Sequence, residues 1–363
     1  MSSTPLMQQY REIKSRHQDA ILFFRMGEFY EMFYDDAETA SRTLGLTLTA
    51  RNNGGAAEVP LAGVPVKAAA EYVRRLVQQG YRVAICEQVE DPKVAKGIVR
   101  REVIETITPG AALADDLLDG ARNNYVCAIA EGGGRREEGG GDRIGVAAAD
   151  ISTGELRLAV VKRAELEPLL SRIAAREIVS GPSSSLLPPT SSLVTAREQW
   201  EFDPALGTED LARHYGVLGL DGLGIAADDA PAVGAAGALL RYLKELQPGG
   251  VSLSRPVVER GGAVMPLDDM TRRNLELVES LRGTSADSVS GTLINVLDRT
   301  VTPMGARLLR QWILAPLTSK QAIDDRLQAV DCFARAPLAR ETLRGALAGV
   351  RDLERLGTKA ALG

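Results

Sequence analysis

The sequence Ile21-Leu-Phe-Phe-Arg-Met-Gly-Glu-Phe-Tyr-Glu-Met-Phe33 organises the first part of the chain. It opens on a continuous apolar run, Ile21 to Phe24, which is typical of a buried strand. Gly27 interrupts this pattern, and we expect a helix to begin there. Apolar residues then recur at steps of four and three from Phe33 to Leu44, which predicts that the helix continues over that range.

Segments on both sides of this stretch complete an α/β pattern. A helix is expected before it, from the helical spacing of Leu6, Tyr10 and Ile13. The later elements are a helix over 69–79, which ends at Gly80, and strands over 81–86 and 103–108. Because strands and helices interleave, we predict a compact mixed α/β domain over residues 1–112, followed by a linker over 113–123.

A second α/β domain is expected over residues 124–248. Its predicted elements are strands over 124–130, 144–150 and 155–161 and a helix over 165–176. The glycine-rich stretch 132–141 joins the first two strands, but it lacks the Gly-Lys-Ser/Thr ending and the following helix of a phosphate-binding loop. It therefore predicts a hairpin tip.

The last part of the chain has a different character. From Asp268 onward turn signals thin out and apolar residues follow helical spacing, as in Leu275, Val278 and Leu281. We therefore expect residues 249–363 to begin an all-helical domain that the chain does not complete. The predicted fold class is multidomain, with mixed α/β domains followed by an all-α domain.

Composition excludes several classes of protein. The 363 residues contain three cysteines and two histidines without Cys-x-x-Cys or Cys/His spacing, so neither a disulfide framework nor a zinc site is expected. No apolar run approaches the roughly 18 residues of a membrane span, and the N-terminus lacks a signal pattern. These features favour a cytoplasmic protein without a membrane partner.

The overall charge does not indicate a protein that coats phosphates. Lys and Arg number 43 and Asp and Glu 48, which gives a net charge of −5. One local basic stretch contains Lys93, Lys96, Arg100 and Arg101. It is either a solvated face or a set of phosphate contacts, and we retain Lys96 and Arg100 as candidates for the second role.

The order Arg25-Met-Gly-Glu-Phe-Tyr-Glu-Met-Phe33 resembles the mismatch-binding motif of the MutS family, whose core is Gly-acidic-Phe-x-Glu. Phe29 and Glu31 fall on the two working positions of that motif. Further matches follow in the order of the family: Ala62-Gly-Val-Pro65, Val83-Ala-Ile-Cys-Glu-Gln88, Thr108-Pro-Gly110, Asp150-Ile-Ser-Thr-Gly-Glu155, Leu267-Asp-Asp-Met-Thr-Arg-Arg-Asn-Leu275 and Met304-Gly-Ala-Arg-Leu-Leu-Arg-Gln-Trp312. The similarity spans nearly the whole chain.

The resemblance implies a mismatch-binding domain over 1–112, a ribonuclease H-like connector domain over 124–248 and the start of a helical lever domain over 249–363. Family members continue to a P-loop ATPase, act as homodimers and work with a MutL-type repair protein. No Gly-x-x-x-x-Gly-Lys-Ser/Thr occurs in this sequence. We therefore expect a DNA-binding fragment without enzymatic activity or cofactor, with ATP and Mg²⁺ used only by the full-length protein.

The resemblance also implies recognition of mismatched or looped duplex DNA. On periodicity alone Phe29 would be a core residue four positions before Phe33, whereas the resemblance makes it a wedge between base steps. Glu31 is expected to hydrogen-bond the displaced base; the alternative is an exposed glutamate at the start of a helix.

Other residues complete the expected DNA-binding set. Met26 either contacts DNA beside the wedge or packs in the core. Arg25 joins Lys96 and Arg100 as a DNA contact. The sequence departs from the family at Val66-Lys67, where many members carry Tyr-His, so contacts made by those two residues are in doubt.

A metal-dependent nuclease is the main alternative function. A ribonuclease H-like domain could use Asp150 as a metal-binding carboxylate, but two-metal hydrolysis needs several converging carboxylates and no further cluster is evident. Asp150 and Glu155 flank the turn Ser152-Thr-Gly154, which they are expected to cap or to solvate. A family member that serves recombination is disfavoured because Phe29 and Glu31 are both present.

Overall fold

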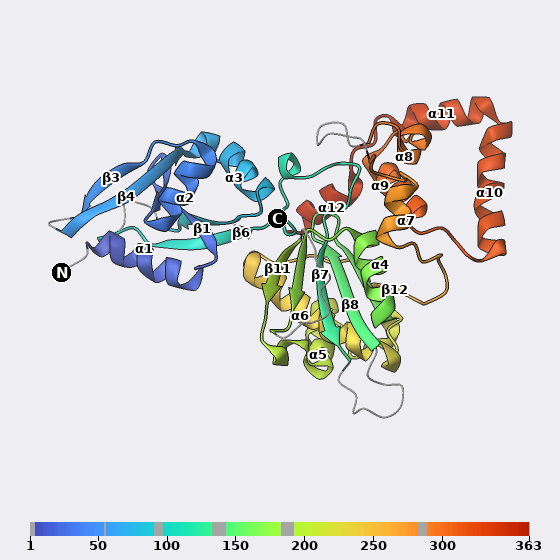
Figure 1. Cartoon of the computed structure of the whole chain (residues 1–363), viewed down its shortest axis with the longest axis horizontal. Coiled ribbons are helices and arrows are strands. Elements are labelled where there is room, and N and C mark those ends of the chain that lie inside the picture. Colours follow the sequence, from blue (N-terminus) through green and yellow to red (C-terminus); the bar gives the residue numbers. More distant parts are fainter. Residues whose placement is uncertain are drawn as a thin grey trace. The chain divides into compact units, whose positions relative to one another are not determined.

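The computed structural model describes residues 4–53, 56–90, 97–132, 143–182, 192–281 and 289–362 (Figure 1). The chain forms two compact units. The first contains residues 1–112 and 242–251, and the second contains residues 113–241 and 252–363.

The first unit is built on a six-stranded mixed sheet of order β3-β4-β2-β1-β5-β6. Only β1 and β5 pair in parallel, and the other neighbours are antiparallel. The strands are β1 (Ala20–Met26), β2 (Phe29–Phe33), β3 (Thr49–Asn53), β4 (Ala56–Pro65), β5 (Arg82–Gln88) and β6 (Arg101–Ile107). The helices are α1 (Pro5–Arg16), α2 (Asp35–Leu44) and α3 (Ala69–Gln78).

The prediction that a helix begins at Gly27 is wrong, because β1 and β2 form a hairpin there. Burial alternates along the first residues of β2, as a strand requires, and aromatic residues favour strands. Tyr34 then takes a positive φ of 56°, and α2 begins at Asp35 with three acidic residues in its first turn. The prediction for 37–44 is confirmed, whereas β4 was not foreseen.

Helix α1 anchors the hairpin to the core. The ring of Tyr10 packs edge-on against Phe24 and Phe33, with ring centroids 5.5 Å and 4.9 Å apart. Its hydroxyl donates to a carboxylate oxygen of Asp36 at 3.1 Å, and Lys14 pairs with that carboxylate at 2.9 Å. The inner end of the hairpin is therefore fixed by apolar packing and by a buried polar network.

The second unit is built on a six-stranded sheet of order β11-β10-β7-β8-β9-β12. Strand β8 is antiparallel to both of its neighbours, and the other pairs are parallel. The strands are β7 (Val126–Glu131), β8 (Arg143–Asp150), β9 (Glu155–Lys162), β10 (Glu177–Ser180), β11 (Leu193–Ala196) and β12 (Val257–Glu259). The β7–β8 pairing confirms the predicted hairpin, although residues 133–141 of its glycine-rich stretch lie outside the described residues.

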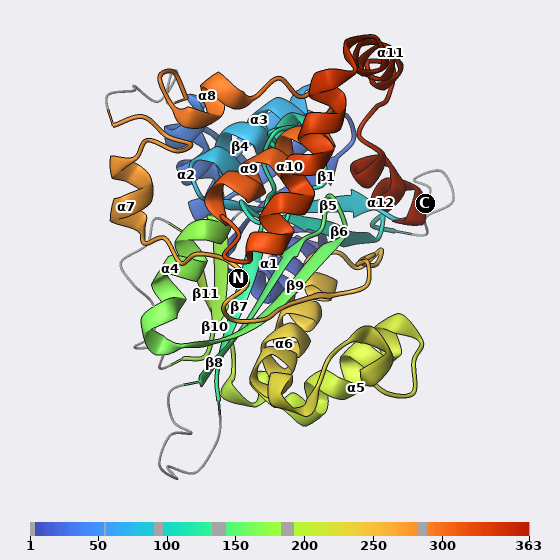
Figure 2. The ribbon, with the colours of Figure 1, turned by 90° about the vertical axis from the view of Figure 1, so that its right-hand side faces the viewer.

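Helices cover both faces of this sheet (Figure 2). Helix α4 (Arg163–Ile173) packs Leu166, Leu169 and Leu170 on the face that carries Ile144 and Val146. Gly145 points to the opposite face, where a Cβ would come within 2.0 Å of the backbone of Pro231 in α6 (Ala230–Leu246). Helix α5 (Pro204–Tyr215) lies against α6 on that side.

The C-terminal part is helical, as predicted, but its first helix is short. Helix α7 (Asp269–Asn274) ends before the expected helical residues Leu275, Val278 and Leu281, so that part of the prediction is wrong. Glu276 has a positive φ of 44°, and its carboxylate accepts from the backbone of Leu281 at 2.9 Å. The remaining helices are α8 (Leu293–Leu297), α9 (Pro303–Leu314), α10 (Lys320–Arg335), α11 (Pro337–Leu347) and α12 (Leu353–Leu362).

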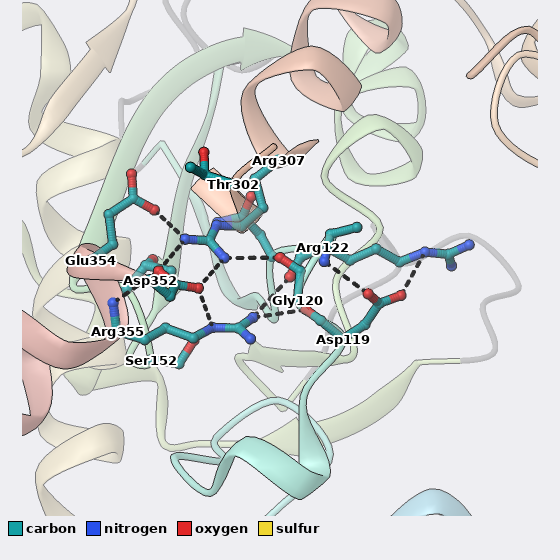
Figure 3. A network of polar contacts seen from close by, with 12 residues as sticks. Asp119, Gly120, Arg122, Ser152, Thr302, Arg307, Asp352, Glu354 and Arg355 are labelled. Atoms are coloured by element: carbon teal, nitrogen blue, oxygen red, sulfur yellow. Dashed lines mark hydrogen bonds and ion pairs between the residues drawn. The ribbon is translucent and has the colours of Figure 1, made fainter. Parts of the chain in front are cut away.

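Two arginines bind the predicted linker to these helices (Figure 3). Arg307 on α9 is buried and donates to Asp352, Glu354 and the carbonyl oxygen of Gly120 at 2.6–3.0 Å. Arg355 on α12 donates to the carbonyl oxygens of Asp119 and Arg122 at 2.9 Å and 3.1 Å. Residues 119–122 are therefore an ordered part of the second unit.

Candidate nucleic-acid interface

The hairpin turn between β1 and β2 presents an aromatic ring to solvent. Met26 and Phe29 pair across a two-residue turn, and Gly27 takes its first position with a φ of +60°. Glycine is favoured there in hairpins because a side chain disfavours a positive φ. Phe29 is 48% exposed. Its interpretation as a core residue is therefore wrong.

Glu31 and Met26 share the face of Phe29. Paired residues of antiparallel strands project to one side, and the register pairs Met26 with Phe29 and Phe24 with Glu31. Met26 is half-buried against the core cluster that contains Phe24, so core packing accounts for part of its surface. Glu31 is half-buried on a strand, and its interpretation as the start of a helix is wrong.

The side chain of Arg101 contacts the hairpin residues next to this face. The sequence analysis did not distinguish Arg101 from the basic residues beside it. Its side chain donates to the carbonyl oxygens of Arg25 and Val99 at 2.7 Å and 2.9 Å. It also contacts the sulfur of Met26 at 3.5 Å and lies over the ring of Phe24, 4.8 Å from the centroid. Arg101 is only 7% exposed, and burial lowers the pKa of its guanidinium, an effect that the charge of Glu31 opposes.

Arg25 lies on the opposite face of the hairpin. Its Nε donates to the carbonyl oxygen of Gly27 at 2.5 Å, and its Nη1 pairs with Glu87 at 3.2 Å. Tyr30 donates its hydroxyl to the same carboxylate, and burial together with this bond raises the pKa of Tyr30 to about 12. The contacts of Arg25 therefore stabilise the turn, and the structure does not bring Arg25 together with Phe29 and Glu31.

The basic stretch contains two residues that were predicted to contact DNA, Lys96 and Arg100. Lys96 lies outside the described residues. Arg100 is exposed and pairs with Glu102, a contact that neutralises part of its charge. The structure therefore places Arg100 at the surface but does not bring it together with the hairpin residues.

The departure at Val66-Lys67 lies at the hairpin itself. Pro65 pairs with Phe29, and the backbone nitrogen of Val66 donates to the carbonyl oxygen of Glu28 at 2.9 Å. Lys67 follows directly and is exposed. The sequence marked this position only as a departure from the family, and the structure adds a cation beside the turn.

The nuclease alternative gains no support from the geometry of Asp150. Asp150 is fully buried, and one of its oxygens accepts from the backbone and hydroxyl of Ser152 at 3.0 Å and 2.6 Å. The other oxygen accepts from Asn123 and from the backbone of Asn124 at 3.0 Å and 3.1 Å. Asp150 therefore caps its turn, as predicted. Among the described residues, no group of three or more His, Cys, Asp or Glu side chains is arranged to hold a metal ion.

Models of three domains of one family match the chain in order. MutS domain I matches residues 4–116, MutS domain II matches residues 124–255 and MutS domain III matches residues 270–363. In the part of the chain that the structure describes, the helices lack the length or the apolar character needed to cross a membrane.

Similar curated proteins carry the name DNA mismatch repair protein MutS. The protein of Solibacter usitatus (strain Ellin6076) is 41% identical over 370 residues, which cover 100% of this chain and 42% of the relative. The protein of Chlorobaculum parvum (strain DSM 263 / NCIMB 8327) is 41% identical, with 97% of this chain and 40% of the relative covered. The protein of Rhodopseudomonas palustris (strain HaA2) is 42% identical, with 99% and 40% covered. The chain thus spans about 40% of the length of these relatives.

Proposed function

The chain belongs to the MutS family of DNA mismatch repair proteins, and on this premise we propose that it recognises mismatched or looped duplex DNA through Phe29 and Glu31. The observation that carries the proposal is the exposure of Phe29, 48%, beside a turn whose backbone oxygens, those of Gly27 and Glu28, accept hydrogen bonds from Arg25 and Val66. An exposed aromatic ring on a rigid support is suited to insertion between base steps.

Phe29 acts as a wedge in this proposal. Unstacking a base step costs a few kcal/mol, and the cost is least where a base pair is mismatched or missing. A ring that inserts into the step recovers part of that cost by stacking, at roughly 1 to 3 kcal/mol per base. Selectivity then follows from the deformability of the duplex rather than from the letters of its sequence.

Glu31 acts as the hydrogen-bonding group beside the wedge. It follows Phe29 by two residues on the same face of β2, so its carboxylate projects beside the ring. A carboxylate accepts hydrogen bonds from the amino and imino groups of a displaced base. The nearby positive charge of Arg101 reduces the repulsion between this carboxylate and DNA phosphates.

The domain roles follow from the family. We propose a mismatch-binding domain over 1–112, a linker over 113–123, a ribonuclease H-like connector over 124–248 and a lever segment over 249–363. Support for the connector comes from the sheet order β9-β8-β7-β10-β11 with β8 alone antiparallel, an arrangement expected of ribonuclease H-like sheets. A cytoplasmic location, the homodimer, the MutL-type partner and the use of ATP and Mg²⁺ are proposals for the longer protein. This chain has no P-loop sequence to hold the nucleotide.

The test is a competition titration of a mismatched against a matched duplex at one salt concentration, in a full-length protein that contains this chain. Phe29→Ala removes the stacking, so preference for the mismatch should fall about five- to over a hundredfold while nonspecific binding persists through phosphate contacts. Trp200→Ala is the matched control, because Trp200 is another exposed aromatic residue, 60% accessible, in the second unit. Preference retained by Phe29→Ala would refute the proposed wedge.

Glu31→Gln in the same titration separates the two roles. The amide keeps a neutral hydrogen-bonding group and removes the charge that repels phosphates. Binding to the matched duplex should therefore rise, and discrimination should fall less than in Phe29→Ala. A fall in matched-duplex binding would contradict this role for the carboxylate.

A further inference from the structure

A cavity of about 560 Å³ lies inside the second unit, and arginine dominates its wall. Eight arginines and four acidic residues line it. Its volume falls within the roughly 300–1,000 Å³ of sites that take small molecules. The residues that line the cavity belong to the second unit, whereas the hairpin of Phe29 belongs to the first.

Part of this arginine wall is already neutralised. Glu259 on β12 pairs with Arg157 at 2.8 Å and also with Arg172. Arg307 is neutralised by Asp352 and Glu354, as Figure 3 shows. Burial alone would raise the pKa of Glu259, but the two arginines lower it, so this carboxylate is charged and occupied. These groups fix the shape of the wall.

Arg272 on α7 is not fully satisfied. It is 5% exposed, and it donates through Nη2 to the carbonyl oxygen of Pro168 at 3.0 Å and through Nε to that of Asp268 at 3.3 Å. Its Nη1 is buried without a hydrogen-bond partner among the described residues. A buried polar group that lacks a partner is costly, and a charged one more so.

Arg310 on α9 is a half-buried second arginine of this wall. Within the described ranges it makes no hydrogen bond or ion pair, and burial and the charge of Arg122 lower its pKa to about 10, although the charges of Glu279 and Asp119 act in the opposite direction. Arg122 itself reaches its carboxylate neighbours Asp119 and Glu279 only at 3.4 Å and 3.6 Å. The positive charges of Arg122 and Arg310 are therefore only partly balanced by the acidic residues near them.

We propose that this cavity binds the phosphate groups of a small molecule through Arg122, Arg272 and Arg310. The planar forks of arginine match phosphate oxygens and form short, charge-assisted hydrogen bonds. Water could satisfy Nη1 of Arg272, but it would not balance the positive charge of Arg310, which makes no ion pair with the described residues. An oxyanion does both, because it accepts several hydrogen bonds and carries negative charge.

Binding would connect three segments of the second unit. Arg122 follows the anchored residues Asp119 and Gly120, whereas Arg272 and Arg310 belong to α7 and α9. A ligand held by all three stabilises the folded unit by mass action. Both tryptophans of the chain, Trp200 and Trp312, lie in this unit, so their fluorescence reports its unfolding.

The experiment is calorimetric titration of the 363-residue chain with inorganic phosphate, pyrophosphate and ADP at constant ionic strength, because salt screens exposed charges. We expect saturable binding of pyrophosphate at one site and a higher unfolding temperature by tryptophan fluorescence. ADP that binds more tightly than pyrophosphate would identify a nucleotide as the source of the phosphates, and equal affinity would identify an inorganic one. Each of these two results supports the shared phosphate chemistry.

Arg310→Gln should weaken pyrophosphate about tenfold or more, since it removes a charged hydrogen-bonding group. Arg310→Lys keeps the charge, so its loss should be smaller and it guards against a folding defect in the first variant. The matched control is Arg335→Gln on α10, an exposed arginine paired with Asp331. The proposal is overturned if none of the three probes binds saturably, or if Arg310→Gln binds pyrophosphate as well as Arg335→Gln does.

Discussion

Two tight turns in this molecule begin from similar sequences and end in opposite environments. Gly27 lies in the turn between β1 and β2, and Gly154 lies in the turn between β8 and β9. Each turn follows a buried strand and contains a glycine that is followed directly by a glutamate. The first presents Phe29 to solvent, whereas the second encloses Asp150.

The difference lies in where the polar groups find their partners. Both carboxylate oxygens of Asp150 are occupied, because one accepts from Ser152 in the turn and the other accepts from Asn123 and Asn124. The turn of Phe29 has its polar partners behind it, in Arg101 and Glu87, and leaves the ring unoccupied. A buried carboxylate whose two oxygens both accept hydrogen bonds from the protein is structural, whereas an exposed ring on a hydrogen-bonded turn is available for binding.

The largest effect that this comparison predicts is the loss of stability in Asp150→Ala. The substitution leaves buried donors of Ser152 and Asn124 without an acceptor, so the free energy of unfolding of the second unit should fall by about 2 to 4 kcal/mol. Urea unfolding followed by tryptophan fluorescence measures this, because Trp200 and Trp312 both lie in that unit.

A control separates this effect from the loss of any carboxylate. Asp331→Ala removes an exposed partner of Arg335 and should change stability by less than about 0.5 kcal/mol. Preference for a mismatch should be unchanged in both variants. Metal-dependent DNA cleavage that Asp150→Ala abolishes without loss of stability would instead restore the nuclease alternative.

A smaller effect is expected at Arg101, which positions the hairpin without belonging to its exposed surface. Arg101→Lys keeps the charge but loses the forked contacts with Arg25 and Val99. Preference for the mismatch should fall about three- to tenfold, the equivalent of one or two hydrogen bonds. The neighbouring variant Arg100→Lys should leave it unchanged. Equal preference in the two variants would show that Arg101 only stabilises the fold.

The sequence predicted the buried strand, the exposed motif and the helices of 37–44 and 69–78, but it misplaced the start of the first of these helices. The reason is the spacing of two aromatic residues along the sequence. Phe29 and Phe33 are four residues apart, and that spacing fits one face of a helix as well as one face of a strand. The two-residue turn at Gly27 decided between them.

Long-range arginine contacts could not be predicted. Arg101 binds Arg25 across 76 residues, and Arg307 binds Gly120 across 187. No local pattern distinguishes Arg101 from the exposed Arg100 beside it. The failed helix over 275–281 has a local cause, since the carboxylate of Glu276 binds the backbone of Leu281 and competes with helical hydrogen bonding.

The smallest effect concerns Lys67, where the sequence departs from its family. This exposed lysine follows Val66, whose backbone is bonded to Glu28 in the turn that carries Phe29. When the ring of Phe29 enters a base step, the ammonium group should therefore lie near the DNA backbone. Lys67→Ala should weaken matched and mismatched duplexes alike and reduce the slope of log affinity against log salt by about one, the value for one lost phosphate contact. Titrations at several salt concentrations measure that slope, and Lys320→Ala on α10 provides an exposed control. An unchanged slope would place Lys67 away from the phosphates, whereas a selective loss of mismatch binding would make it part of the wedge.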